Sequence, residues 1–301
     1  MLISFGGPSA GAWAEPASVA RFAARGEELG YHGYWTFQRL LVGVEQDLAP
    51  VYRRVLDPML TLAYAAACTH TIRLGVAVLN LPYLSPTYLA KQAGTLDVLS
   101  GGRAVLGLGT GWSEPEFVAT GSDPRPRGRR TEEYLAVLRT LWDDPVAEFD
   151  GEFYRVPPAV MEPRPVRPGG PPILLGGTAE VALRRAGRLA SGWVSSSRAS
   201  FDEIARGAQI VRQAAEQAGR DPAGVQIVVR GVVHAGDRDD SLPLSGDWAQ
   251  IRAGAERYAE AGVTELFYDL NWDPVIGSPD TEPERAADRA EEFLTALAPG
   301  R

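Results

Sequence analysis

The chain alternates short apolar runs with helical patterns along its whole length, and this alternation most narrows the folds open to it. Several runs are nearly continuous in Val, Ile and Leu, as in parallel strands covered on both faces. A helical segment follows each of the eight runs, and the expected strands cover residues 2–5, 33–37, 72–81, 103–109, 172–177, 192–197, 225–233 and 264–271. Strand–helix alternation predicts a parallel α/β fold. Eight repeats in 301 residues favour a (β/α)8 barrel over an open doubly wound sheet.

One interval breaks this repeat. Residues 143–171 separate the fourth expected helix, 131–142, from the fifth expected strand. They contain the segment AEFDGEFYRV, in which Asp150–Gly151 suits the turn of a β-hairpin. We interpret 143–171 as an insertion in a single barrel domain that spans residues 1–301, and not as a second domain.

Composition and charge argue against several kinds of partner. The chain carries 38 acidic residues and 30 Lys and Arg residues, a net charge of −8, so it is a poor candidate for binding nucleic acid or an anionic membrane. No run approaches the roughly 20 apolar residues of a membrane span. The single cysteine and the scattered His32, His70 and His234 show no ligand spacing, so we expect no metal. The N-terminal MLISFGGPSA lacks the features of a secretory signal, and we expect a cytoplasmic protein.

The segment GRAVLGLGTGWSEPEF, residues 102–117, lies where the fourth expected strand ends. Its glycines do not complete a dinucleotide-binding fingerprint, because Trp112 stands where a further glycine is needed. Gly107, Gly109 and Gly111 permit a close approach to the backbone, either by a ligand or by a crowded corner of the barrel. The same loop leads into Glu114 and Glu116, which are candidates for acid–base groups or simply acidic residues that open a helix.

A second glycine-rich turn follows the fifth expected strand, in ILLGGTAEVALRRAGR. Backbone N–H groups at a helix N-terminus bind anions, and Gly176 and Gly177 would let a phosphate approach. The alternative is a tight turn capped by Thr178, and we favour phosphate.

Polar residues at three further strand ends complete the candidate site. Gln38 and Arg39 follow the second expected strand, and Asn80 ends the third; taken alone, these segments are also consistent with ordinary loops. The segment PRPRGRR, residues 124–130, places four arginines beside the fourth strand end. In an acidic protein such a basic cluster suits the anionic tail of a ligand.

Together these segments resemble the bacterial luciferase-like family of flavin- and deazaflavin-dependent oxidoreductases over nearly the whole chain. The resemblance is strongest in RLGVAVLNLP, LAKQAGTLDVLSGGRAVLGLGTGWSEPEF, RRTEEYLAVLRTLW, FDGEFYRV, PPILLGGTAEVALRRAGRLASGW and LFYDLNWDP. It implies a (β/α)8 barrel with an insertion after the fourth helix. It also implies a flavin-like ring at the C-terminal face, with the glycine run of strand four ending under that ring.

The resemblance further implies where the cofactor lies. A non-prolyl cis peptide near Ala77–Val78 would lie behind the ring, with Asn80 close to the ring edge. The cofactor phosphate would lie on the glycine-rich turn after strand five. The cofactor-binding residues expected on this basis are Ala77, Val78, Asn80, Gly109, Gly111, Trp112, Arg127, Arg130, Gly176, Gly177 and Thr178.

The chain looks most like the members that use coenzyme F420, whose phosphate and oligoglutamate tail give the arginines a role. It departs from many relatives in having Gln38 and Arg39 where they carry Asp-His. Gln38, Arg39 and Glu114 are therefore the residues we name for catalysis, while the proton donor is Glu114, Tyr83 or solvent.

The leading hypothesis is an F420-dependent oxidoreductase that transfers a hydride to or from a small organic substrate. The alternatives are an FMN-dependent monooxygenase fed by a separate reductase and a non-catalytic flavin-binding barrel. A phosphate-binding barrel lyase without flavin is disfavoured. Such an enzyme would need a lysine to form a Schiff base, but lysine is nearly absent from the chain and Lys91 lies in an expected helix. Relatives in this family are often dimers, so the resemblance implies a homodimer. Separately, we expect the aromatic residues to line an apolar substrate pocket; they are Trp13, Tyr83, Trp112, Trp193 and Trp272.

Overall fold

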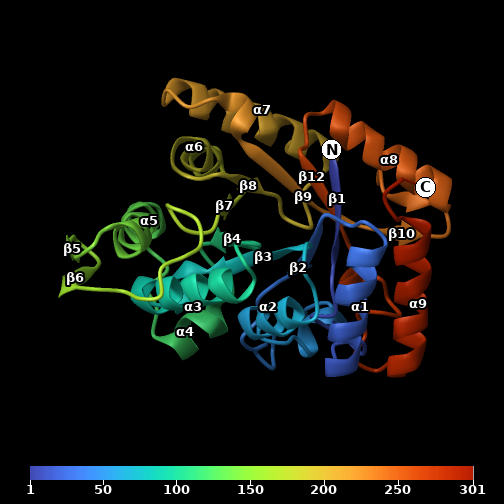
Figure 1. Cartoon of the computed structure of the whole chain (residues 1–301). Helices are drawn as coiled ribbons and strands as arrows, with labels where there is room; N and C mark the ends of the chain where they lie inside the picture. The colour runs from blue at the N-terminus through green and yellow to red at the C-terminus, as the bar shows by residue number, and fades with distance from the viewer. Residues whose placement is uncertain (301) are drawn as a thin grey trace.

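All eight expected strands form one closed parallel barrel in the computed structural model, which describes residues 1–300 (Figure 1). The order around the barrel is β1-β12-β9-β8-β7-β4-β3-β2, and β2 pairs with β1 to close it. The predicted (β/α)8 fold is therefore confirmed. The barrel strands are β1 (Leu2–Gly6), β2 (Gly33–Thr36), β3 (Arg73–Asn80), β4 (Ala104–Gly109), β7 (Ile173–Gly176), β8 (Gly192–Val194), β9 (Gln226–Val232) and β12 (Glu265–Asp269).

Helices surround the barrel and cover the outer faces of its strands (Figure 1). They are α1 (Pro16–Glu28), α2 (Pro58–Ala67), α3 (Pro86–Leu99), α4 (Glu114–Thr120), α5 (Arg127–Asp143), α6 (Glu180–Leu189), α7 (Phe201–Gln217), α8 (Trp248–Glu260) and α9 (Pro283–Ala296). The first and last helices lie side by side, where Arg25 of α1 is ion-paired with Glu291 of α9 at 2.8 Å. Within residues 1–300, no helix combines the length and the apolar character that crossing a membrane requires.

Element ends differ from the sequence expectation in two places that matter for function. The helix expected over 131–142 begins at Arg127, so the arginine cluster continues into its first turn. The strand expected over 192–197 ends at Val194. There the Ser195 hydroxyl accepts a hydrogen bond from the Arg230 backbone N–H at 3.0 Å, so a side chain replaces the next rung of the ladder.

The segment between α5 and β7 contains the hairpin predicted at Asp150–Gly151. Strands β5 (Ala147–Asp150) and β6 (Arg155–Ala159) pair antiparallel, and Asp150 is opposite Arg155. The hairpin lies beyond α5, away from the barrel (Figure 1). The Glu133 carboxylate of α5 holds it by accepting from the Phe153 and Tyr154 backbone N–H groups at 2.8 and 2.6 Å.

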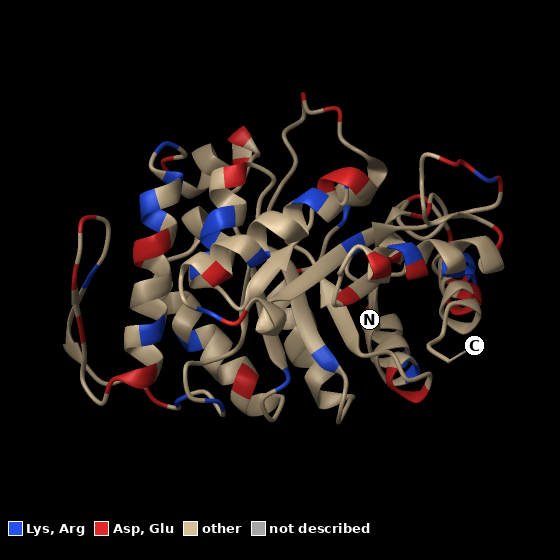
Figure 2. Cartoon of the chain, turned by 90° about the horizontal axis from the view of Figure 1, so that it is seen from above, with Lys and Arg blue, Asp and Glu red and all other residues tan. Residues whose placement is uncertain are grey.

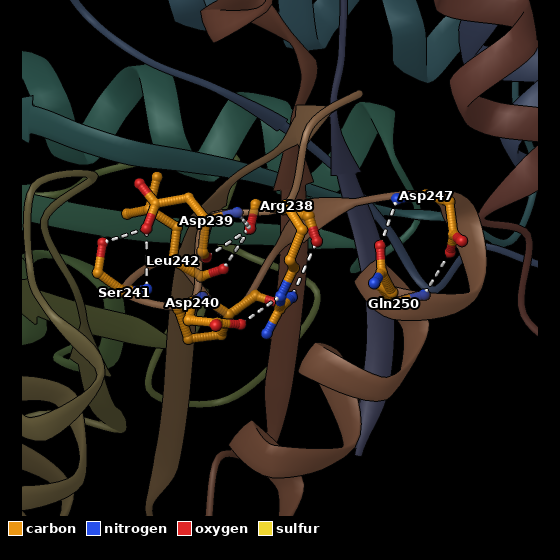
Figure 3. A network of polar contacts seen from close by, with 9 residues as sticks. Arg238, Asp239, Asp240, Ser241, Leu242, Asp247 and Gln250 are labelled. Atoms are coloured by element: carbon orange, nitrogen blue, oxygen red, sulfur yellow. Dashed lines mark hydrogen bonds and ion pairs between the residues drawn. The ribbon is translucent and has the colours of Figure 1, made fainter.

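A second small sheet follows β9, where β10 (His234–Ala235) pairs with β11 (Ser245–Gly246). Figure 3 shows how local contacts hold this segment: Arg238 bonds to Asp240 and to the Ser245 carbonyl, and Asp239 accepts from Ser241. Asp247 and Gln250 form a reciprocal capping box at the start of α8. These polar groups are satisfied among themselves.

The barrel interior is filled by side chains and closed at its N-terminal end by a polar network. Trp35 and Phe267 stack at 5.2 Å in its middle. Below them the buried Glu265 carboxylate accepts from Ser4, Trp35 and Arg73 at 2.6, 2.8 and 3.0 Å. Most charged residues otherwise lie on the surrounding helices and loops (Figure 2). The interior is thus no channel, and we expect a ligand to bind at the opposite, C-terminal mouth.

Candidate active site at the C-terminal mouth of the barrel

The third strand is irregular where it reaches the mouth. Its register against β4 shifts between Val76 and Leu79, and the Ala77–Val78 peptide bond is cis, at the bond the resemblance implied. Val78 is the partly exposed member of a buried cluster inside the barrel that includes Ala77. It lies over the ends of β4 and β7, because a Cβ on Gly109 would meet Val78 Cγ2 at 2.6 Å and one on Gly176 would meet Cγ1 at 3.3 Å.

The glycines of GLGTG are required by the packing of the chain itself. A Cβ on Gly107 would lie 2.2 Å from the Val76 carbonyl oxygen of the neighbouring strand. Gly111 has a φ of +73°, and a Cβ there would meet the Tyr83 hydroxyl at 2.7 Å. Of the two interpretations of this run, the crowded barrel corner therefore accounts for these glycines without a ligand.

A buried ion pair at the mouth joins Arg39 to Glu116. Arg39 Nη1 donates to Glu116 Oε2 at 2.9 Å, and the two side chains are 4% and 1% exposed. The other carboxylate oxygen, Oε1, accepts from the Leu40 backbone N–H at 2.7 Å. Glu114 instead lies exposed in the first turn of α4. The acid that reaches the site is thus Glu116, although we had named Glu114 for catalysis.

Aromatic rings enclose the Arg39 guanidinium on two sides. Its Cζ lies 4.4 Å from the Trp112 ring centroid and 4.7 Å from that of Tyr52. Tyr52 in turn meets Phe37 and Trp272 edge-on at 6.2 and 5.7 Å. Cation–π contact and the acid partner together fix the orientation of Arg39.

The aromatic lining is therefore only partly the one expected. Trp112 and Trp272 lie at the mouth, but Trp13 is fully buried against Phe22 and donates to Asn271. Trp193 is also buried, below the glycine-rich turn, and donates to the Gly177 carbonyl at 2.9 Å. Both are packing residues. Phe37 was expected only as a residue of the second strand, and Tyr52 stands in no motif, so neither ring was expected in this lining.

Gln38 and Asn80 meet across β2 and β3. The Gln38 side-chain oxygen accepts from the Asn80 backbone N–H at 2.9 Å, and both residues are 7% exposed. Gln38 thus completes the irregular end of β3, and its side-chain oxygen is already engaged.

Arg230 is the main residue of the mouth that the sequence analysis did not single out. It lies near the end of β9, its side chain is 10% exposed, and its Nε donates to Asp269 Oδ2 at 2.5 Å. Nη1 donates to the Ala77 carbonyl at 3.2 Å. The Phe37 ring centroid lies 4.6 Å from Cζ. A signal existed, because Arg230 is the one charged residue of the expected strand 225–233.

Four buried polar atoms at this mouth have no hydrogen-bond partner within residues 1–300. They are Arg39 Nε, Tyr83 Oη, Arg230 Nη2 and Trp272 Nε1. Burial and the nearby Glu116 carboxylate raise the pKa of Tyr83 well above its ordinary value, so its hydroxyl stays protonated at neutral pH. Each of the four groups carries a proton that it can donate. Buried donors without partners are uncommon, and their clustering here points to a ligand with acceptor atoms.

The glycine-rich turn after β7 leaves a helix N-terminus without a side-chain cap. Gly177 has a φ of +133°, a conformation that favours glycine. The N-cap of α6 is Ala179, which makes no side-chain cap hydrogen bond, and Thr178 is exposed. Thr178 is therefore not the cap that the alternative interpretation required. The first N–H groups of α6 are available to an anion.

The arginine cluster divides into two kinds. Arg125 is paired with Asp123 at 3.0 Å and Arg129 with Glu152 at 2.6 Å. Arg127 and Arg130 bond to backbone carbonyls, and no ion pair with a carboxylate is found for them within residues 1–300. Arg127, Arg129 and Arg130 also lie in the first turn of α5, where the helix dipole disfavours cations.

Comparison with known proteins gives a consistent result. The model of the family described as luciferase-like monooxygenase matches residues 2–243. An uncharacterized protein of Mycobacterium tuberculosis is 32% identical over 295 residues, covering 94% of this chain and 92% of its own. An F420-dependent glucose-6-phosphate dehydrogenase of Kineococcus radiotolerans is 27% identical over 249 residues, covering 80% and 71% of the two chains.

Solved structures share the fold. A monooxygenase of Streptomyces bottropensis superimposes with a TM-score of 0.80 at 20% identity, covering 99% of both chains. An F420-dependent secondary alcohol dehydrogenase does so with a TM-score of 0.78 at 16% identity, covering 99% of this chain and 98% of the other. At these identities the likeness shows the barrel fold.

Proposed function

Because the chain belongs to the luciferase-like monooxygenase family and is therefore an oxidoreductase, we propose that it uses coenzyme F420 to transfer a hydride to or from a small organic substrate. The cluster of buried, unpartnered donors at the barrel mouth carries this proposal, since it suits a ring with several acceptor atoms. The F420-dependent relative from Kineococcus radiotolerans supports the choice of cofactor.

The residues present fit such a cofactor. The uncapped N-terminus of α6 and the turn at Gly176, Gly177 and Thr178 would hold its phosphate. Arg127 and Arg130 would hold its anionic tail. The two helices are linked at this point, because Arg185 of α6 donates to Glu132 of α5 at 3.2 Å.

The ring would lie at the mouth. Ala77 and Val78 would form the surface behind it, and Asn80, Gly109, Gly111 and Trp112 its edge. The packing roles of the glycines agree with this, because they bring β3 and β4 close enough for Val78 to lie over both strand ends.

When bound, F420 supplies hydride transfer, a two-electron chemistry that does not activate oxygen. Arg39, fixed by Glu116 and two rings, would orient a polar group of the substrate. An alkoxide formed from a carbonyl substrate needs a proton, and the buried Tyr83 hydroxyl is the proton donor we propose in place of Glu114. Gln38 would support the site through Asn80.

Cofactor identity is tested by titrating the purified protein with F420 and separately with FMN, following fluorescence. Tight binding of F420 alone supports the proposal, and substrates are then screened with the reduced deazaflavin. Tight binding of FMN alone favours the second candidate, a reductase-fed monooxygenase, which the structural likeness to the Streptomyces bottropensis monooxygenase supports. Binding without turnover across electron donors would instead indicate a flavin-binding protein, and binding of neither would contradict all three.

Replacing both Arg127 and Arg130 by alanine is expected to weaken F420 binding roughly tenfold at low salt, since two surface charges act on an anionic tail. The loss should shrink as the salt concentration rises. Fluorescence titrations over a salt series measure it.

The double variant Arg125→Ala and Arg129→Ala is the matched control, because it removes the same charge from the same segment. Both of these arginines already have carboxylate partners. Equal effects of the two double variants would indicate that the positive charge of the segment attracts the cofactor without specific contacts. If the double variant Arg127→Ala with Arg130→Ala kept the parental affinity for F420, the proposal that these arginines bind the tail would be contradicted.

A further inference from the structure

Arg230 is built into the barrel mouth as a rigid donor. Its Nε bonds to Asp269 of β12 and its Nη1 to the Ala77 carbonyl of β3, so the guanidinium bridges two strands that are not neighbours in the barrel. The Phe37 and Trp272 rings lie 4.6 and 6.0 Å from Cζ. The side chain is thereby fixed by contacts on several sides, and only Nη2 is left without a partner.

The opposite end of the barrel shows what a purely structural arginine looks like here. Arg73 is also paired with a buried acid, Glu265, at 3.0 Å. Its remaining contacts go to His32 and to the Gln226 side-chain oxygen, and no buried atom of Arg73 lacks a partner within residues 1–300. The two arginines therefore differ in one respect: only the one at the ligand-binding end has an unused buried donor.

We propose that Arg230 is a ligand-binding residue, an inference that rests on the proposed function. Its Nη2 donates a hydrogen bond to a carbonyl or carboxylate oxygen of the molecule bound at the mouth. Asp269 neutralises most of the charge, so the site selects an oxygen acceptor by geometry and does not require a full negative charge. That oxygen belongs either to the cofactor ring or to the substrate, and the two sources give different results below.

Arg230→Gln is expected to weaken binding about ten- to hundredfold, the loss typical of a buried hydrogen bond from a charged donor. If the oxygen is on the cofactor, the Kd for F420 in the absence of substrate rises by this factor. If it is on the substrate, the cofactor Kd stays at the parental value and KM rises. Fluorescence titration of the cofactor and steady-state kinetics separate these two results, and either supports the assignment.

Two controls separate direct contact from damage to the fold. Arg230→Lys keeps a positive charge beside Asp269 but removes Nη2, so it should lose as much affinity as Arg230→Gln. Arg73→Gln should lower the thermal unfolding midpoint without changing either affinity. Parental affinities in Arg230→Lys together with a loss in Arg230→Gln would show that the charge beside Asp269 is what matters, and would overturn direct contact by Nη2.

Parental cofactor affinity and KM in Arg230→Gln would overturn the assignment while leaving the proposed function standing. A parent protein that binds neither F420 nor FMN would overturn the proposed function, and the assignment with it.

Discussion

Replacing Glu116 by leucine is expected to lower the free energy of unfolding by about 3–5 kcal/mol, because it leaves the Arg39 charge buried without an acid. The Leu40 backbone N–H loses its acceptor in the same variant. Reversible denaturant unfolding measures this loss. Glu114→Leu is the matched control on the same helix turn, and its cost should stay below about 1 kcal/mol, since Glu114 is exposed and contributes through the helix dipole.

The double variant Arg39→Met with Glu116→Leu distinguishes stability from function. Replacing a buried ion pair by apolar side chains is often neutral or stabilising, so the double variant should be more stable than Glu116→Leu alone. Ligand binding and turnover should nevertheless be lost, because Arg39 no longer orients the substrate. A double variant with parental turnover would show that the pair serves the fold only. If the Glu116→Leu variant were as stable as the parent, the conclusion that Arg39 and Glu116 form a buried ion pair would be wrong.

Gly107→Ala is expected to destabilise the barrel by about 3 kcal/mol or more, because the added methyl group would lie 2.2 Å from the Val76 carbonyl oxygen. The contact is with backbone in the neighbouring strand, so no side-chain rotation relieves it. Thermal and denaturant unfolding of the variant test this.

Gly94→Ala is its control. Gly94 lies inside α3, and a Cβ there would have its nearest neighbour at 3.6 Å, an ordinary contact. In a helix this exchange should stabilise by roughly 0.5–1 kcal/mol. If Gly107→Ala unfolds like the parent and instead loses cofactor affinity, the glycine is needed for the ligand, and the packing explanation of GLGTG is wrong.

The fold was predictable because its signal is local and repeated. Each apolar run needs only its own residues to be recognised, and all eight form barrel strands. The Asp150–Gly151 turn was predictable for the same reason, since the hairpin it starts closes within a few residues. Element ends were less predictable. The early end of β8 depends on a hydrogen bond between Ser195 and Arg230, 35 positions apart.

The site was predictable as a set of strand ends and not as a set of contacts. Closing the barrel necessarily gathers the residues that follow its strands, so Arg39, Asn80 and the glycine-rich turns could be named. Their partners could not. The pairing of Arg39 with Glu116 joins residues 77 positions apart, and the bond from Arg230 to Ala77 spans 153. The neighbouring residues in the sequence did not distinguish Glu114 from Glu116. Both lie in the first turn of the short helix α4, and they differ only in that Glu114 is exposed and Glu116 is buried.

By itself the sequence determined the (β/α)8 barrel and the family to which the chain belongs, and it predicted the end of the barrel at which the candidate site lies. Hydrophobic periodicity and turn residues act over short stretches of chain, and they are visible in the order of the residues. Only the tertiary structure decided which acid is buried, which aromatic rings face the mouth and which donors remain unused. These features depend on the burial of side chains and on contacts between distant segments. Both arise only when the strands have closed into the barrel.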